Sequence, residues 1–271
     1  AAATSRHKDL RYAQEILSRR VRASSPYRRL KLAMDYWCAL WFWPLEKADM
    51  LPSREEWLFD MELLLHGGVI DSVRTGESQL PLFPSTAKEE AEQLVLRFGM
   101  VNVETLLSGN GRLKTADDLA RKYRFLHWEI EFADIFAFRG GFDLVLGNPP
   151  WIKVEWTEGD VLGDSSPLFV FRNYSATKMT RLREELLQDE ALRRRYVDAY
   201  EEAAGQQNFL NARCNYPELH GMQSNLYKCF LPVAWRIGSE RGVSAFLHPE
   251  GVYDDPNGGA LRRLLYSRLR Y

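Results

Sequence analysis

The sequence predicts an α/β protein in which helices occupy most of the chain and only part of a parallel sheet is present. Two short apolar runs, at residues 142–146 and 242–247, have the composition of strands that are buried on both faces. The chain before and between these runs has mostly helical patterns. Because an open doubly wound sheet needs more than two strands, we expect part of such a sheet with large helical insertions.

The composition is that of a folded globular protein. The chain has 271 residues, of which 45% are hydrophobic and 27% charged, and its mean hydropathy is −0.37. These values exclude disorder and collagen-like repeats, and the length fits one large or two modest domains. The net charge of −1 excludes a polycation, so any contact with nucleic acid must come from local patches.

No membrane segment, secretory signal or metal site is predicted. The longest aromatic and apolar run, residues 36–43, is far shorter than the ~18 residues of a membrane span. No apolar stretch follows the basic N-terminus, so we expect a cytoplasmic protein without a membrane partner. Cys38, Cys214 and Cys229 form no Cys-x-x-Cys pair, which favours reduced, buried thiols.

Residues 1–124 are predicted to form a helical region, as an insertion or an accessory domain. A pair of amphipathic helices is expected between residues 10 and 43, and a third helix begins at Ser53, which forms a capping box with Glu56. Further helices are expected at 86–97 and 115–123. The following residues are expected to share the packed face of the helical pair: Leu30, Ala33, Met34, Trp37, Leu40 and Trp41.

A boundary is predicted near Arg124, where aromatic and β-branched residues become frequent. Between the two predicted strands lies a helical and amide-rich insertion, at about residues 178–225. The chain has no initiator Met, and residues 261–266 predict a helix with no stop signal before Tyr271. We therefore expect a fragment of a longer polypeptide.

The first predicted strand ends in Asn148, Pro149, Pro150 and Trp151. Ligands of open α/β sheets bind at the carboxyl ends of strands, so Asn148 falls where chemistry is expected. The two prolines make the turn rigid and leave the Asn148 side-chain oxygen and a main-chain carbonyl as paired acceptors. Such acceptors suit an exocyclic amino group, and Trp151 provides a face on which a planar base can stack.

These four residues resemble the Asn-Pro-Pro-aromatic motif of amino-group methyltransferases that use S-adenosylmethionine. The chain resembles above all the adenine-specific DNA methyltransferases of the large restriction-modification and phage-defence type, including DISARM- and BREX-like methylases. Residues 127–132 and 140–143 are similar to the lead-in of that motif. Residues 225–230 and 241–251 are similar to the next helix, strand and post-strand turn of the catalytic domain.

The resemblance implies that residues 125–271 form a partial Rossmann-like catalytic domain, which methylates adenine in double-stranded DNA. Asn148 and the Pro149 carbonyl would then accept from the amino group of a flipped base, and Trp151 would stack on it. Asn225 and His248 are candidates for substrate contacts, with turn chemistry as the alternative for Asn225 and a structural role as the favoured alternative for His248. Other subunits of a defence system are possible partners.

The glycine-rich cofactor loop that the resemblance implies is not found in the sequence. Gly109, Asn110 and Gly111 form a Gly-x-Gly triplet, but no good strand precedes it, so a plain turn between helices is expected. The residues that bind S-adenosylmethionine are therefore expected outside the chain. Two alternatives remain: a non-catalytic interaction module or pseudo-enzyme in a defence complex, and a methyltransferase acting on RNA or on protein amides.

Other residues have weaker functional interpretations beside structural ones. Glu129 and Glu131 are expected on one solvated face of a strand, and no nuclease motif accompanies them. His127 is expected to be structural, and Asp254 and Asp255 to lie in a solvated loop. The aromatic run at 36–43 is expected in the core, with a docking surface as the alternative. A solvated helix face, or else a phosphate contact, is expected for the basic cluster of Arg19, Arg20, Arg22, Arg28, Arg29 and Lys31.

Overall fold

The structure is a computed structural model that describes residues 26–66, 103–172, 174–222 and 225–269. The first of the two helices predicted before Trp43, the helix predicted at 86–97 and the arginines before residue 26 lie outside the described residues. The described residues form two compact units. The N-terminal unit comprises them up to Leu40 and from Glu46 to Glu131, and the C-terminal unit comprises Trp41–Leu45 and those from Phe132 onward.

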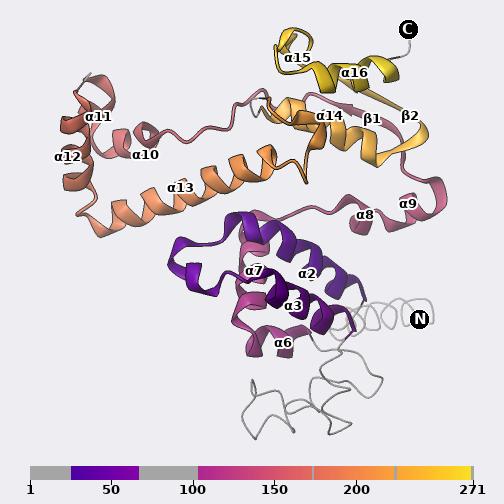
Figure 1. Ribbon diagram of the computed structural model, residues 1–271, viewed down its shortest axis with the longest axis horizontal. Coiled ribbons are helices and arrows are strands. Elements are labelled where there is room, and N and C mark those ends of the chain that lie inside the picture. Colours follow the sequence, from indigo (N-terminus) through magenta and orange to yellow (C-terminus); the bar gives the residue numbers. More distant parts are fainter. Residues whose placement is uncertain (1–25, 67–102, 173, 223–224, 270–271) are drawn as a thin grey trace, which may run out of the picture. The chain divides into compact units, whose positions relative to one another are not determined.

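The N-terminal unit is helical in the part that the structure describes (Figure 1). Helix α2 packs against α3 and α7. The elements are α2 (Pro26–Ala39), η1 (Leu40–Phe42), η2 (Leu45–Met50), α3 (Arg54–His66), α6 (Val103–Gly109), α7 (Gly111–Tyr123) and α8 (Trp128–Glu131), of which η1 and η2 are 3₁₀ helices at the border of the unit.

The packed face of α2 agrees only in part with the predicted one. Ala33 of the predicted face is buried, whereas Leu30 and Trp37 are exposed, and the helix also buries Leu32 and Tyr36. Apolar residues lie on both sides of this helix, so their spacing alone does not define the buried face. Asp35 lies on the buried side, where it accepts from Lys31 Nζ at 3.0 Å and lies 2.8 Å from Nε2 of His127.

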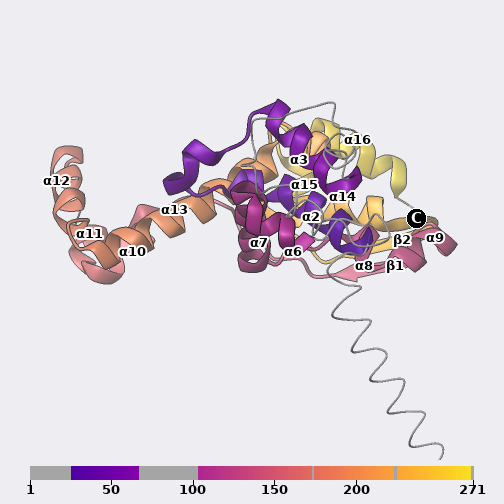
Figure 2. The same ribbon diagram turned by 90° about the horizontal axis from the view of Figure 1, so that it is seen from below.

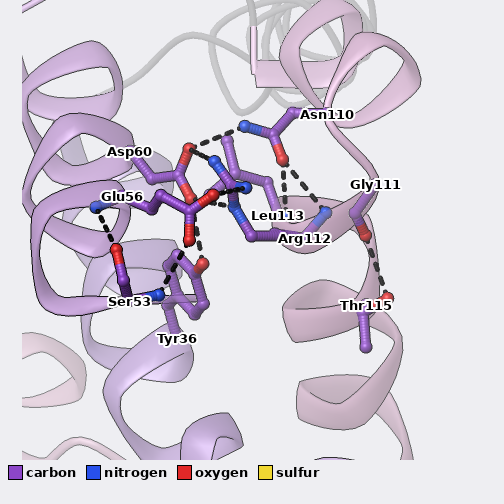
Figure 3. Close-up of polar contacts among 9 residues, drawn as sticks. All are labelled: Tyr36, Ser53, Glu56, Asp60, Asn110, Gly111, Arg112, Leu113 and Thr115. Atoms are coloured by element: carbon purple, nitrogen blue, oxygen red, sulfur yellow. Dashed lines mark hydrogen bonds and ion pairs between the residues drawn. The ribbon is translucent and has the colours of Figure 1, made fainter. Parts of the chain in front are cut away.

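A buried carboxylate joins α2, α3 and the start of α7 (Figure 3). Asp60 is fully buried and accepts hydrogen bonds from Tyr36 Oη at 2.9 Å, Asn110 Nδ2 at 2.8 Å and Arg112 Nε at 2.9 Å. Burial, and then the Asp60 charge, raises the pKa of Tyr36, so its hydroxyl remains a donor. The network satisfies a charge that would otherwise be costly to bury.

Both local helix signals of this unit are confirmed. Ser53 and Glu56 form the reciprocal capping box, with Ser53 N donating to Glu56 Oε2 at 2.8 Å and Glu56 N to Ser53 Oγ at 3.2 Å. The triplet at 109–111 is a turn between α6 and α7, as predicted. Asn110 caps α7, because its Oδ1 accepts from the backbone N–H groups of Arg112 and Leu113.

Three expectations for charged residues of this unit are resolved. Glu129 and Glu131 lie on helix α8, so the predicted strand is wrong; a two-residue alternation cannot distinguish a strand from one helical turn. His127 is buried beside Asp35, which confirms its structural role. The described arginines of the basic cluster are not on a solvated face: Arg28 pairs with Asp117 at 2.7 Å, and Arg29 Nε donates to Leu64 O at 3.0 Å.

The C-terminal unit contains the parallel sheet and the predicted helical insertion (Figure 1). Trp41 and Phe42 pack on Phe209 in this unit. The core prediction for the run at 36–43 holds in part: Tyr36, Ala39 and Trp43 are buried, and Trp37 is exposed. The elements are α9 (Ala133–Arg139), β1 (Phe142–Gly147), α10 (Glu158–Ser165), α11 (Pro167–Phe171), α12 (Ala176–Leu186), α13 (Glu190–Asn211), η3 (Pro217–Leu219), α14 (Leu226–Ile237), β2 (Gly238–Phe246), α15 (Gly251–Asp254) and α16 (Gly259–Arg268).

The two predicted strands pair in parallel, as expected, and form a two-stranded sheet in the part of the chain that the structure describes. Leu144 pairs with Val243 and Leu146 with Ala245. The expectation that the strands are buried on both faces is wrong, because Leu144 and Leu146 are 57% and 65% exposed. On the same face Phe142 packs against Phe132 and Phe136, and on the opposite face Phe246 packs against the core cluster that includes residues of α14.

The insertion is helical, as predicted. Helices α10, α11 and α12 gather at one end of α13 (Figure 2), around the buried side chains of Leu162, Phe169 and Leu192. The fold as a whole is mostly helical with a small parallel sheet, which is consistent with an α/β methyltransferase-like fold. The division into a helical region at 1–124 and a partial catalytic domain at 125–271 stays a prediction, because packing does not show which residues act in catalysis.

The end of the chain and the cysteines differ in part from expectation. Helix α16 ends at Arg268, and Leu269, the last described residue, has an extended backbone conformation. Cys229 is buried and Cys38 partly buried, and burial raises the pKa of both thiols to about 12. Cys214 is exposed, which the sequence did not predict. Among the described residues no helix is long and apolar enough to cross a membrane.

Candidate target-amine site

The segments that follow the two strands meet at one edge of the sheet, because the strands are parallel. Asn148 comes directly after β1, and His248 lies two residues after the end of β2. The pairing continues beyond β2, since Leu247 N donates to Gly147 O at 3.0 Å. The rigid Asn148-Pro149-Pro150-Trp151 turn therefore leaves the sheet beside the segment that contains His248.

Trp151 is held at this edge with much of its ring open. Its Nε1 donates to the backbone oxygen of Leu247 at 3.4 Å, and the residue is 53% exposed. An indole anchored through its polar edge still offers an apolar face. This arrangement suits the stacking role that the sequence predicts.

Asn225 is brought to the same turn by backbone pairing. Leu226 N donates to Ile152 O at 2.9 Å, and Asn225 forms an isolated antiparallel bridge with Lys153. Asn225 precedes α14, but its side chain does not cap the helix. Its Oδ1 is buried without a hydrogen-bond partner in the part of the chain that the structure describes. An acceptor in this state is suited to a donor group from a ligand.

His248 contacts two tyrosine rings. Its ring centroid lies 5.7 Å from that of Tyr227, nearly parallel at 10°, and 5.9 Å from that of Tyr253, tilted at 36°. Its Nδ1 lies 2.8 Å from the Pro249 carbonyl oxygen. The predicted substrate contact of His248 stays a prediction.

A buried ion pair between α14 and the segment after β2 was not predicted from the sequence. Lys228 is buried, and its Nζ donates to Asp255 Oδ2 at 2.5 Å. This hydrogen bond holds the pKa of Asp255 below its usual range. The pair ties α14 to the segment after β2, so the prediction of a solvated loop at Asp255 is wrong. No spacing rule could have found it, since the two residues are far apart in the chain.

The described residues do not fit S-adenosylmethionine. Gly109-Asn110-Gly111 is a helix cap, and the glycines near the strand ends are closely packed: an added Cβ at Gly147 would lie 3.1 Å from the Phe246 ring, and one at Gly251 3.3 Å from Tyr227 Oη. No group of three or more potential metal ligands occurs among the described residues. The described strand ends therefore present polar acceptors and an exposed aromatic ring, and no glycine-rich cradle is found among the described residues.

Comparison with known proteins points to the methyltransferase class that the sequence motif also indicates. Residues 85–181, roughly a third of the chain, match the family model of the Eco57I restriction-modification methylases, and the matched segment contains β1 and the Asn148–Trp151 turn. No curated protein and no solved structure matches the chain. The similarity supports a restriction-modification methyltransferase family for this segment.

Proposed function

We propose that this chain carries the target-amine site of an adenine-specific DNA methyltransferase from a restriction-modification or phage-defence system. The observation that supports it is the position of the Asn148-Pro149-Pro150-Trp151 turn, directly after β1 and beside the segment that follows β2. S-adenosylmethionine is the proposed methyl donor, double-stranded DNA the proposed substrate and the cytoplasm the proposed location.

The proposed chemistry depends on two acceptors in a rigid turn. The lone pair of an exocyclic amine on adenine is delocalised into the ring, so the nitrogen is a poor nucleophile. When Asn148 Oδ1 and the Pro149 carbonyl oxygen each accept one amino N–H, the nitrogen is favoured to become tetrahedral and its lone pair localises. Pro150 keeps the turn rigid, so the acceptors need little reorganisation.

The target base must leave the duplex to reach this turn, because its amino group is otherwise paired. The open face of Trp151 supports stacking on the extruded base, which offsets part of the cost of unstacking it. We assign Asn225 to the substrate side of the site on the strength of its unpartnered Oδ1 and its pairing with Lys153.

The decisive experiment replaces the proposed acceptor. The gene is expressed with its native context in a host without adenine methylation, and N6-methyladenine in the host DNA is measured by mass spectrometry. Asn148→Ala is expected to reduce the modification at least about a hundredfold, because an electrostatic contact made in the transition state is lost. Asn215→Ala is the matched control, since the Asn215 side chain donates to Phe209 O within the core.

Each other outcome contradicts the proposal in a defined way. Unchanged methylation in Asn148→Ala removes the assigned role of the turn. Absence of methylation with the unaltered protein favours a non-catalytic module. Methyl groups found in RNA or on protein amides, and not in DNA, favour one of the other substrate classes.

A further inference from the structure

Four aromatic rings form a continuous column in the C-terminal unit. Tyr227, His248, Tyr253 and Tyr266 follow one another with centroid distances of 5.7, 5.9 and 6.5 Å and interplanar angles of 10°, 36° and 9°. Edge-to-face contacts are a common arrangement of aromatic pairs, and several pairs elsewhere in this unit adopt it. Two of the three contacts in this column are nearly parallel, and the middle one is tilted.

The column runs from the core to the surface. Tyr227 is buried at one end, whereas Tyr253 is 45% and Tyr266 53% exposed. Tyr266 is therefore the more exposed of the two rings at the surface end. The column is connected to the candidate site through the chain after β2. Trp151 Nε1 donates to Leu247 O, and the next residue, His248, belongs to the column.

The helix that carries Tyr266 is basic. Helix α16 contains Arg262, Arg263 and Arg268 and no acidic residue. Arg263 precedes Tyr266 by three positions, which places the two side chains as neighbours on the helix surface. Arg263 is exposed and has no carboxylate partner among the described residues. Leu261 and Leu265 are buried, so this helix has an apolar side in the core and a cationic, aromatic side in solvent.

We propose that Tyr266, at the exposed end of this series of rings, is a stacking platform for a nucleobase of single-stranded DNA, with Arg263 on the adjacent phosphate. This inference rests on the proposed function and extends it to the strand outside the target turn. Aromatic rings beside unpaired cations are the combination that binds single-stranded nucleic acid, since every base has a face to stack and every nucleotide carries a charge.

The test measures binding of the full chain to a short fluorescein-labelled single-stranded DNA by fluorescence anisotropy. Tyr266→Ala is expected to weaken binding about fivefold or more, and Tyr266→Phe, which keeps the ring, to stay within about twofold of the unaltered chain. Tyr200→Ala is the control, because Tyr200 is also partly exposed but lies on α13. With 2-aminopurine in the oligonucleotide, the quenching on binding is expected to decrease in Tyr266→Ala alone.

The contribution of charge is measured through the salt dependence of the same binding. Arg263→Gln is expected to reduce the slope of log K against log salt by about one, as expected for one lost phosphate contact. Arg194→Gln is the control, since Arg194 is paired with Glu190. A chain that does not bind single-stranded DNA, a Phe variant as weak as the Ala variant, or an equal loss in Tyr200→Ala would each overturn the platform.

The two proposals fail separately. Asn148→Ala is read by methylation, and the platform is read by the difference in binding between Tyr266→Ala and Tyr266→Phe. If Asn148→Ala methylates DNA normally while Tyr266→Ala still weakens binding, the target-amine assignment fails and the platform stands. If methylation depends on Asn148 but binding is insensitive to Tyr266, only the platform fails.

Discussion

The indole Nε1 of Trp151 donates a hydrogen bond to the backbone oxygen of Leu247 at 3.4 Å. This contact joins the turn after β1 to the segment after β2, so one aromatic side chain takes part in both strand ends. A ring in this position is held by its edge and remains accessible through its face.

Replacing Trp151 is therefore expected to affect activity far more than stability. Trp151→Ala should lower DNA methylation about tenfold or more through lost stacking, and Trp151→Phe only a few-fold. The free energy of unfolding should change by less than about 1 kcal/mol in both variants, because the residue is largely exposed. Phe171→Ala, which removes an exposed aromatic ring from α11, is the control for both assays. Equal losses of activity in Trp151→Ala and Phe171→Ala would contradict the assignment.

Asp60 is expected to be a major determinant of the stability of the N-terminal unit. Asp60→Ala leaves Arg112 and Asn110 without their buried acceptor, so the free energy of unfolding should fall by about 3–5 kcal/mol in urea titrations. Asp118→Ala is the comparison, since Asp118 forms an exposed pair with Lys114 and should cost no more than about 1 kcal/mol. Similar values for the two variants would show that the network is not stabilising.

The Lys228–Asp255 pair predicts a loss of stability in acid. The pKa of Asp255 is depressed in the folded state, so its contribution is fully present above the unfolded value of about 3.9. That contribution is lost as the pH falls through the lower, folded pKa. In Lys228→Met this part of the pH dependence should disappear, because the largest cause of the depression is removed. Urea unfolding at a series of acidic pH values measures it, and parallel curves for the two proteins would refute the interpretation.

Gly141 is expected to tolerate no side chain. Its φ of +135° lies where residues with a side chain are strained, and an added Cβ would lie 2.6 Å from the Ile237 carbonyl oxygen. Gly141→Ala should destabilise the protein by about 1–3 kcal/mol from backbone strain alone. Gly109→Ala, at a helical position with no atom within 4 Å of the added Cβ, should be neutral or slightly stabilising. Thermal unfolding of both variants measures the effect. An unchanged melting temperature in Gly141→Ala would contradict the strained geometry of this residue.

The 271-residue chain is not expected to bind S-adenosylmethionine measurably, because its described residues offer no glycine cradle at the strand ends. Isothermal titration calorimetry of the chain with the cofactor measures this. Micromolar binding would show that a cofactor site has been overlooked, and Gly109-Asn110-Gly111 would be the first segment to mutate.

Features that depend on neighbouring residues were predictable from the sequence. The Ser53 capping box and the turn at Asn110 are set by residues within one helical turn, and both are confirmed. The parallel strand pair and the segment after β1 were also predictable, because a strand followed by two prolines is a local pattern.

Features that depend on residues distant in the chain were not predictable. The buried face of α2 includes Asp35 and the contact of Tyr36 with Asp60, neither of which helical spacing encodes. The Lys228–Asp255 pair and the aromatic column likewise join residues from different elements. For the candidate site, the sequence predicted the turn at Asn148, but the residues that surround this turn could be identified only from the fold.

The unequal burial of the three cysteines makes site-selective labelling possible without mutagenesis. A maleimide reacts with the thiolate, and raised pKa values of about 12 leave Cys38 and Cys229 almost entirely protonated at neutral pH. Exposed Cys214, in the segment between α13 and η3, is then the cysteine that accepts a fluorophore or spin label first. A probe at this position would report on the C-terminal unit in the unaltered protein.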